Sequence, residues 1–362
     1  MKPYLTLPVF AFISVVFGCI ALYSEEARPQ NGAAQTRTAS APATREVIDM
    51  AGRTVKLRQE IKRLCTLGSV PMMNTFIESL GAGRLIYNQP TKFHDIYGRW
   101  KMHLEFAPQI VNGPHFQSPS HELLIEKILE ADNDVCVTNQ RPILETLDRV
   151  GVPTVFVDWS TVERMMDSVT MMGKVLHEEE RAATYIRYFH ETKERLTALG
   201  KSIPPSKRLT VLYGTQMLQQ FRVPGNLTEA WLEAVGANSV TKNIHADGRR
   251  EYDIEELLKW DPEVIFLTNH KTAEELKKNP IYKNVRAVKN NAIVLAPVVG
   301  HMWSGVTVEA PVVACWMMHK LYPELMPKEQ LVKEIRYFYK TFFAYEMSDR
   351  QIDDIIAGGS NG

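Results

Sequence analysis

Histidine, arginine and aromatic residues recur in the loops that follow predicted strands, and each type can bind a ligand in its own way. The imidazoles of His94, His115 and His301 could coordinate iron or another transition metal directly. Guanidinium groups could offset carboxylate charge, and aromatic rings could cover flat organic surface. The candidates of these two kinds are Arg141, Arg222 and Arg249, and Tyr97, Trp100, Tyr213 and Trp303. Several of these residues therefore suit an anionic metal chelate.

The segment PVVGHMWSG, residues 297–305, is the strongest of these candidates. A loop with two glycines leaves His301 and Trp303 room to reach a ligand. His301 and His94 are the candidates for direct contact with a metal. Any single histidine is more often an ordinary loop residue, however, and Arg249 and Arg250 lie in a polar stretch where they could simply be solvated.

Catalytic motifs are missing from the sequence. It contains no G-x-S-x-G elbow, no HExxH helix and no glycine loop that would cradle a phosphate. Ser118 and Ser120 lie beside His115 and His121, but no strand-to-helix elbow presents them. We therefore predict no catalytic residue, and a secreted hydrolase is the weaker alternative.

One phrase occurs twice, as EKILEADNDVCVTN at 126–139 and as EELLKWDPEVIFLTN at 255–269. Each copy predicts a short amphipathic helix, a tight turn at Asp132-Asn133 or Asp261-Pro262, and a buried strand. Helical spacing places Glu126 and Glu255 off the buried stripe, so both should face water. The residues expected on that stripe are Leu124, Ile125, Ile128 and Leu129 in the first copy, and Ile254, Leu257 and Leu258 in the second. The phrase fits either two ordinary helix–strand units or a duplicated protein that presents one acid on each lobe.

The elements that must position these residues alternate between helix and strand. Such alternation implies parallel strands joined by right-handed crossovers, and 362 residues exceed what one core usually organises. Residues 161–203 contain no proline and read as one long helix, or as two with a break near Gly173. The predicted fold is therefore α/β, with two Rossmann-like lobes at 45–160 and 204–356 joined by a helix at 161–203. Residues 357–362 would form a flexible tail.

Composition narrows the class of partner. The chain is 45% hydrophobic and 23% charged, with 42 basic and 42 acidic residues, so it lacks the basic surface that nucleic acid requires. Cys65, Cys136 and Cys315 each lie in an apolar run, where thiols are usually buried and inert. We expect no nucleic-acid partner and no intrinsic cofactor.

The N-terminus predicts export. Residues 1–24 have the layout of a secretory signal, marginally long enough to be an uncleaved anchor. Cys19 follows Val16-Phe17-Gly18, which is similar to a bacterial lipoprotein signal except for Phe17, so Cys19 is either lipidated or removed with the signal. Residues 25–44 are poor in large apolar side chains and predict a disordered tether. The mature protein would lie in the periplasm or at the outer face of the cytoplasmic membrane.

The order of these segments resembles the periplasmic substrate-binding proteins of ABC importers for iron siderophores, haem and vitamin B12. The resemblance runs from about Arg45 to Ile356. It is carried by VIDMAGRTVKL, IKRLCTLGS and EKILEADND in the first half, and by EAVGANSV, IEELLKWDPEVIFL and EAPVVACWMMHKLYPE in the second. That class has two Rossmann-like lobes bridged by a single helix.

The resemblance implies a function and two kinds of site. A monomeric receptor would capture an iron chelate of the siderophore type between its lobes, close modestly over it, and deliver it to a membrane permease with its ATPase. By motif position, Glu126 and Glu255 would dock with arginines of the permease, with Glu122 and Glu256 close enough to make the contact instead. Haem, cobalamin and nickel chelates are alternative ligands, and metal handling without a dedicated transporter is an alternative role.

Overall fold

The computed structural model describes residues 43–92, 94, 96–214, 221–222, 226–242, 251–305 and 307–358. Residues 42–362 form one compact unit. The predicted signal, Cys19 and nearly all of the predicted tether lie outside the described residues. Strand β1 already begins at Thr44, the last residue assigned to that tether.

The first lobe begins with an antiparallel hairpin, β1 (Thr44–Ile48) and β2 (Thr54–Arg58), as the sequence predicts. Gly52 takes φ +78° in its turn, a conformation that favours glycine. A parallel sheet follows in the order β3 (Leu64–Leu67), β4 (Val135–Thr138) and β5 (Thr154–Phe156). The helices of this lobe are α1 (Val70–Glu78), η1 (Gly83–Leu85), α2 (Met102–Phe106), η2 (Pro108–Asn112), α3 (Ile125–Glu130) and α4 (Arg141–Arg149).

The second lobe contains a parallel four-stranded sheet in the order β11-β10-β6-β8. Its strands are β6 (Thr210–Gly214), β8 (Asn238–Ser239), β10 (Val264–Leu267) and β11 (Ile293–Leu295), and a two-stranded pair joins β7 (Phe221–Arg222) to β9 (Glu251–Tyr252). The helices are η3 (Pro205–Lys207), α7 (Asn226–Ala234), α8 (Ile254–Trp260), α9 (His270–Lys278), η4 (Pro280–Tyr282), α10 (Arg286–Lys289), α11 (Ala310–Leu321), α12 (Lys328–Phe342) and α13 (Asp349–Ala357). The predicted α/β class and parallel sheets are confirmed.

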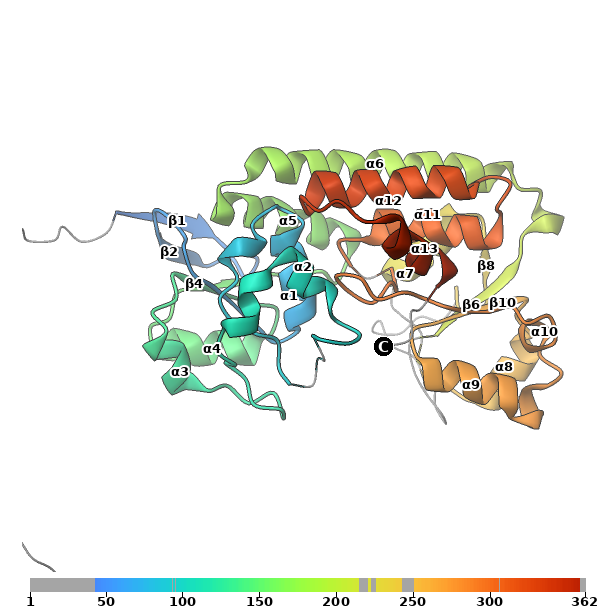
Figure 1. Ribbon diagram of the computed structural model, residues 1–362, viewed down its shortest axis with the longest axis horizontal. Coiled ribbons are helices and arrows are strands. Elements are labelled where there is room, and N and C mark those ends of the chain that lie inside the picture. Colours follow the sequence, from blue (N-terminus) through green and yellow to red (C-terminus); the bar gives the residue numbers. More distant parts are fainter. Residues whose placement is uncertain are drawn as a thin grey trace, which may run out of the picture. The chain divides into compact units, whose positions relative to one another are not determined.

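Two helices occupy the segment between the lobes, α5 (Val162–Leu176) and α6 (Glu179–Ser202). The chain breaks at His177, which takes the left-handed φ of 57°, four residues beyond the break considered at Gly173. Gly173 instead lets the two helices approach, because a Cβ there would lie 2.7 Å from Cβ of Ala182. Helix α6 packs on α5 and also on α7 and α11 of the second lobe (Figure 1).

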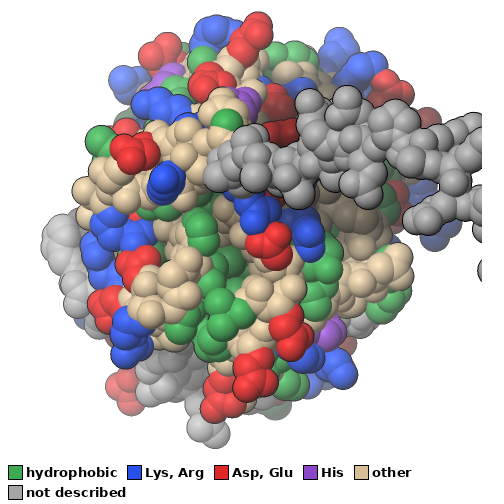
Figure 2. All heavy atoms as spheres, turned by 90° about the vertical axis from the view of Figure 1, so that its left-hand side faces the viewer, with side chains coloured by type: hydrophobic (Ala, Val, Ile, Leu, Met, Phe, Trp, Pro, Cys, Tyr) green, Lys and Arg blue, Asp and Glu red, His purple; other side chains and the backbone are tan. Residues whose placement is uncertain are grey.

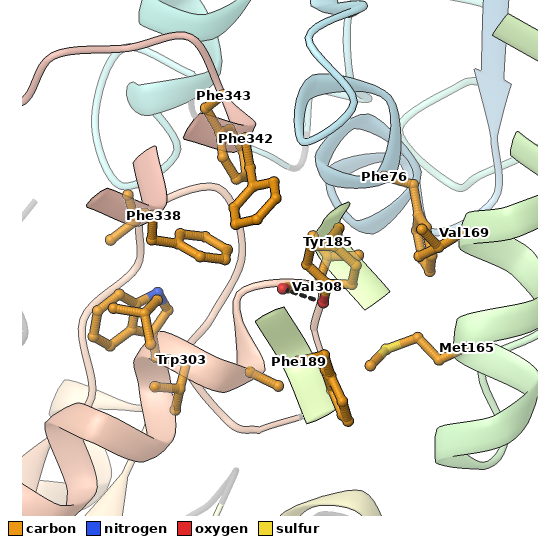
Figure 3. Close-up of a cluster of buried hydrophobic side chains, with 14 of the residues drawn as sticks. Phe76, Met165, Val169, Tyr185, Phe189, Trp303, Val308, Phe338, Phe342 and Phe343 are labelled. Atoms are coloured by element: carbon orange, nitrogen blue, oxygen red, sulfur yellow. Dashed lines mark hydrogen bonds between the residues drawn. The ribbon is translucent and has the colours of Figure 1, made fainter. Parts of the chain in front are cut away.

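A single hydrophobic cluster runs through both lobes and helix α6. Tyr185 on α6 is buried, and its hydroxyl donates a 2.6 Å hydrogen bond to the carbonyl of Val308 (Figure 3). Phe189, one turn further along α6, packs edge-on against Trp231 of α7 with ring centroids 5.1 Å apart. Since α6 packs against α5 and against α7 and α11 of the second lobe, its packing limits how the lobes can move relative to each other.

The C-terminal helices also reach the first lobe. Phe106 of α2 packs against Phe343 with ring centroids 4.7 Å apart, and the Tyr345 hydroxyl donates to Glu105 at 3.2 Å. The last part of the segment assigned from sequence to the second lobe therefore links the two lobes, in addition to α6.

The duplicated phrase forms the same structure in each lobe, as α3 leading to β4 and α8 leading to β10. Asp132 and Asp261 both take left-handed backbone angles in the turn, with φ 46° and φ 41°. Glu126 and Glu255 are both exposed.

The buried face of α3 and α8 is narrower than the sequence predicted. Leu129 is 49% exposed and Leu258 is 41% exposed, so their assignment to the buried set was wrong. The two helices have six and seven residues, and only Ile128 and Leu257 in them are buried. A helix of under two turns offers the core one side chain rather than a full stripe.

The acid eight residues after each glutamate anchors the neighbouring parallel strand. Asp134 Oδ2 accepts the backbone N–H groups of Lys62 at 2.6 Å and Arg63 at 2.7 Å, directly before β3. Glu263 Oε2 accepts the N–H of Thr210 at 2.8 Å, at the start of β6. In both lobes the repeated acid therefore satisfies donors where a strand enters the sheet.

We predict that Asp134→Asn lowers the free energy of unfolding by roughly 1–3 kcal/mol, because two backbone donors lose a buried, charged acceptor. Asp132→Asn is the control: its side chain is 64% exposed, so the expected change is within about 0.5 kcal/mol. Urea unfolding at pH 7 measures both, and equal stabilities of the two variants would contradict the anchoring role.

The stabilising effect of Asp134 should depend on pH. Burial raises the pKa of Asp134, but hydrogen bonds from Arg63, Lys62 and Arg58 outweigh it and lower the pKa below its ordinary value. The stabilisation is therefore complete above the ordinary pKa and is lost as pH falls through the lowered one. Wild-type protein and Asp134→Asn should converge in stability as the pH is lowered below 4, a range that follows from the ordinary carboxyl pKa of about 3.9.

Candidate functional site

Two predicted histidines from different lobes meet around one tryptophan. The ring of Trp100, which is 8% exposed, lies 5.3 Å from His94 and 5.7 Å from His301, measured between ring centroids. His94 and Trp100 belong to a loop of the first lobe, and His301 belongs to the loop that follows β11 in the second. We call these three residues, with His103 and Arg99, the imidazole cluster.

His103 is a member that the sequence analysis missed. Its ring stacks on Trp100 at an interplanar angle of 13°, and the side chain is fully buried. Nδ1 lies 2.8 Å from Oε1 of Glu78, while Nε2 is buried with no hydrogen-bond partner among the described residues. A carboxylate on one ring nitrogen orients an imidazole and leaves the other nitrogen for a ligand. Nothing in the sequence around Glu78 or His103 signals that they meet.

A second buried carboxylate holds the His301 loop. Glu309 accepts the backbone N–H groups of His301 at 2.7 Å and Gly300 at 3.1 Å, and it also accepts the hydroxyl of Tyr339. Burial raises the pKa of Glu309, and these hydrogen bonds lower it in part. The loop is thereby fixed, and the buried Nδ1 of His301 has no partner among the described residues.

Burial keeps two of the imidazoles uncharged. Burial, together with the nearby His103, His94 and Arg99, lowers the pKa of His301 to about 4. Burial also lowers the pKa of His94 to about 4, with contributions from His121 and His103. At neutral pH both rings are therefore neutral, the form that coordinates a metal without first losing a proton.

Arg99 connects the lobes at this cluster. Its guanidinium donates to the carbonyl of Thr268, directly after β10 of the second lobe. Close to it, a Cβ on Gly300 would lie 2.7 Å from Cγ2 of Thr75 on α1, so the loop of the second lobe touches a helix of the first. The cluster therefore combines a permanent positive charge with neutral imidazoles at a contact between lobes.

The described residues contain no group of three or more histidine, cysteine or acidic side chains arranged to hold a metal ion.

Three other candidate ligand residues make separate contacts. His115 places Nδ1 2.9 Å from the carbonyl of Pro90. The guanidinium of Arg141 lies 5.0 Å from the ring centroid of Phe156, in a cation–π contact. Tyr97 is 71% exposed. These residues stay candidates, but none is part of the imidazole cluster.

Tyr213 and Trp303 lie in the core, contrary to the predicted role in ligand contact. Both side chains are at most 1% exposed, and the Tyr213 hydroxyl donates to the carbonyl of Trp303. Burial raises the pKa of Tyr213 well above its ordinary range. Apolar residues around a strand end can belong to the core as easily as to a site, so we leave both out of the cluster. Arg249, Arg250 and the side chain of Arg222 lie outside what the structure describes.

The two motif glutamates differ from the turn aspartates of the duplicated phrase. Asp132 pairs with Arg58 at 2.6 Å and Asp261 pairs with Arg286 at 2.9 Å. Glu126 and Glu255 are exposed and have no ion-pair partner within the described part of the chain. Each lobe therefore presents one unpaired carboxylate at an equivalent position.

The serines of the hydrolase alternative do not form a catalytic pair. Ser118 and Ser120 join their hydroxyls at 2.8 Å, and Ser118 also accepts the N–H of Glu122 at 3.1 Å. His115 faces Pro90 rather than either serine.

Among the described residues, no helix is both long enough and apolar enough to cross a membrane.

Comparison with known proteins identifies the family. The model of a family described as periplasmic binding protein matches residues 100–298, more than half of the chain. The chain belongs to the periplasmic binding protein family. The crystal structure of a periplasmic solute-binding protein from Veillonella parvula has the same fold, with a TM-score of 0.72 at 22% identity over 86% of this chain and 97% of that one.

Two proteins of Bacillus subtilis are similar to a smaller part of the chain. The Fe(3+)-citrate-binding protein YfmC of Bacillus subtilis is 24% identical over 37% of this chain and 42% of its own length. The iron(3+)-hydroxamate-binding protein YxeB of the same organism is 22% identical over 47% of this chain and 57% of its own length. The match therefore spans about half the length of these two relatives.

The buried imidazoles predict that stability falls in mild acid. The unfolded chain binds protons on histidine near pH 6.5, whereas His301 and His94 bind them only near pH 4, so folding weakens as pH falls between these values. Each such proton adds a slope of at most about 1.4 kcal/mol per pH unit. Urea unfolding from pH 7 to pH 4 should show a smaller slope in His301→Asn than in wild type. His190→Asn, which changes an exposed histidine on α6, should keep the wild-type slope, and an unchanged slope in His301→Asn would contradict its burial as a neutral ring.

Proposed function

We propose that this protein is an exported solute-binding protein that captures an iron chelate between its lobes and delivers it to an ABC permease. The observation that carries the proposal is the imidazole cluster, in which neutral His94 and His301 from different lobes meet at Trp100 beside Arg99. Membership of the periplasmic binding protein family supports a binding rather than a catalytic role. The names of two relatives, which bind Fe(3+)-citrate and iron(3+)-hydroxamate, support an iron chelate.

The chemistry of the cluster suits each part of such a ligand. Citrate and hydroxamate chelators surround iron with oxygen atoms. Arg99 can offset the surplus carboxylate charge of a ferric citrate or donate hydrogen bonds to the oxygens of a ferric hydroxamate. The ring of Trp100 can cover the organic part, and a neutral imidazole can accept a hydrogen bond or fill an open coordination position. Glu78 and Glu309 do not face the ligand in this proposal, because one is bound to His103 and the other to the His301 loop.

Delivery is assigned to the exposed glutamates of the duplicated phrase. Glu126 and Glu255 could each meet an arginine of the permease with two parallel hydrogen bonds. A single exposed pair contributes little, but two pairs on different lobes fix the orientation of the complex and speed encounter. The predicted signal in residues 1–24, and lipidation at Cys19, would hold the protein on the outer side of the cytoplasmic membrane.

Ligand binding can be followed through the fluorescence of Trp100. We predict that ferric citrate or a ferric hydroxamate quenches the tryptophan emission of the purified protein, and that Trp100→Phe removes much of the quenching. His301→Asn and Arg99→Gln should each weaken binding by about tenfold or more, equivalent to about 1.4 kcal/mol. His190→Asn is the matched control and should bind like wild type.

Haem, cobalamin and a nickel–histidine complex form the comparison set in the same titration. Tight binding of one of these, with the same sensitivity to His301→Asn, would correct the ligand and keep the site. Affinities unchanged by all three cluster variants would show that the ligand binds elsewhere.

Docking is tested by reversing both charges. The double variant Glu126→Arg with Glu255→Arg should lose uptake of the ligand while its affinity for the ligand stays unchanged, since both side chains lie outside the imidazole cluster. Glu130→Arg, an exposed acid on the same helix α3, should transport normally. Normal uptake by the double variant would refute docking through these glutamates.

A further inference from the structure

Two leucines are exposed in the described part of the chain, and they occupy equivalent positions. Leu129 is 49% exposed and Leu258 is 41% exposed, whereas the other described leucines are at least partly buried. Leu129 lies three residues after Glu126 on α3, and Leu258 lies three residues after Glu255 on α8. Side chains three residues apart share one face of a helix, so each leucine lies beside an exposed carboxylate.

Core packing does not account for these leucines. In each helix the preceding residue, Ile128 or Leu257, is at most 1% exposed and supplies the contact with the sheet. Each lobe also exposes an aliphatic side chain just beyond its following helix, Val150 after α4 at 40% and Ile281 after α9 at 52%. Because Leu129 and Leu258 lie at equivalent positions of the duplicated phrase, their exposure is a feature of the duplicated unit rather than an accident of one loop.

The two copies occupy comparable places in the fold. In Figure 1, α3 and α4 at one end and α8 and α9 at the other all lie on the side of the folded unit away from α6. Figure 2 views the end that carries the first lobe, where apolar side chains are exposed among charged groups of both signs. A single flat partner could therefore contact both copies at once.

We propose that Glu126 with Leu129 and Glu255 with Leu258 form a bipartite docking surface, in which each carboxylate orients the permease and each leucine inserts into an apolar pocket on it. This inference rests on the proposed function and names what the docking surface recognises. Because the two pairs are copies of one motif, the partner must present two equivalent sites, each with a basic group beside an apolar recess. A membrane protein with two-fold symmetry meets that requirement.

The two components of the surface respond differently to salt. Attraction between exposed charges is screened at high ionic strength, whereas burial of a leucine side chain is not. The glutamates should therefore govern the rate of association at low salt, and the leucines should govern the lifetime of the complex at any salt. This difference separates the new inference from docking by charge alone.

The first experiment identifies what touches the leucines in living cells. A photoreactive benzoylphenylalanine is placed at position 129 or 258 of the full chain, and at Ile48 or Tyr337 as controls, which are exposed apolar residues outside the duplicated phrase. We expect positions 129 and 258 to cross-link to the same integral membrane protein and the controls not to do so. Cross-links from the two positions to different proteins, or to a second copy of this chain, would overturn the inference.

The second experiment measures affinity for that membrane protein in lipid nanodiscs at 50 mM and 500 mM NaCl. Leu129→Ala and Leu258→Ala should each weaken binding by about tenfold at both salt concentrations, as expected for burying part of a leucine side chain. Glu126→Gln and Glu255→Gln should weaken binding mainly at 50 mM, and Ile48→Ala should have no effect. Thermal unfolding checks that each variant is folded.

The failures of the two proposals are distinguishable. Wild-type affinity in both leucine variants, together with lost affinity in the glutamate variants, would refute the inference and leave the proposed function intact. If no membrane protein is cross-linked and uptake of the ligand is unchanged in cells that lack this protein, the proposed function fails as well.

Discussion

The close packing of helix α6 at both of its ends constrains the rest of the structure. At one end, Gly173 of α5 leaves no room for a side chain against Ala182, and at the other, a Cβ on Gly200 would lie 2.7 Å from the backbone nitrogen of Gly236. Between these ends, Tyr185 is hydrogen-bonded to Val308 in the second lobe. A close-packed interior resists sliding, so we expect the lobes to rotate only slightly about this helix. The ligand site that we propose would then be nearly formed before the ligand arrives.

The imidazole cluster fits that constraint. Each of its two sides is fixed by a buried carboxylate, Glu78 on His103 and Glu309 on the backbone of the His301 loop. Burying a carboxylate is costly unless it is hydrogen-bonded. Here the hydrogen bonds of the two carboxylates hold the imidazoles in position, and neither carboxylate places its own negative charge in the proposed ligand site. The positive charge comes instead from Arg99, whose contact with Thr268 joins the lobes. An anionic ligand that replaced this contact would couple its own binding to closure.

The sequence predicted the fold well because the duplicated phrase carries local signals. The apolar runs, the acid before each strand and the turn at Asp132 or Asp261 are all read within fifteen residues, and the structure confirms them in both lobes. Of the imidazole cluster, His94, Trp100 and His301 were candidates from the sequence because they lie in loops after predicted strands. His103 was missed because its partner Glu78 is 25 residues away and buried, and the exposure of Leu129 depends on how short α3 is. Tyr213 and Trp303 show the reverse error, because composition cannot tell a core aromatic from one that covers a ligand.

The most direct test of the central claim is metal analysis, with an absorption spectrum, of the mature chain purified from cells without refolding. The account predicts about one iron per chain with a ligand-to-metal charge-transfer band, and loss of both in His301→Asn and Arg99→Gln but not in His190→Asn. Iron and spectrum retained in full by both cluster variants would contradict the placement of the ligand between the lobes at Trp100.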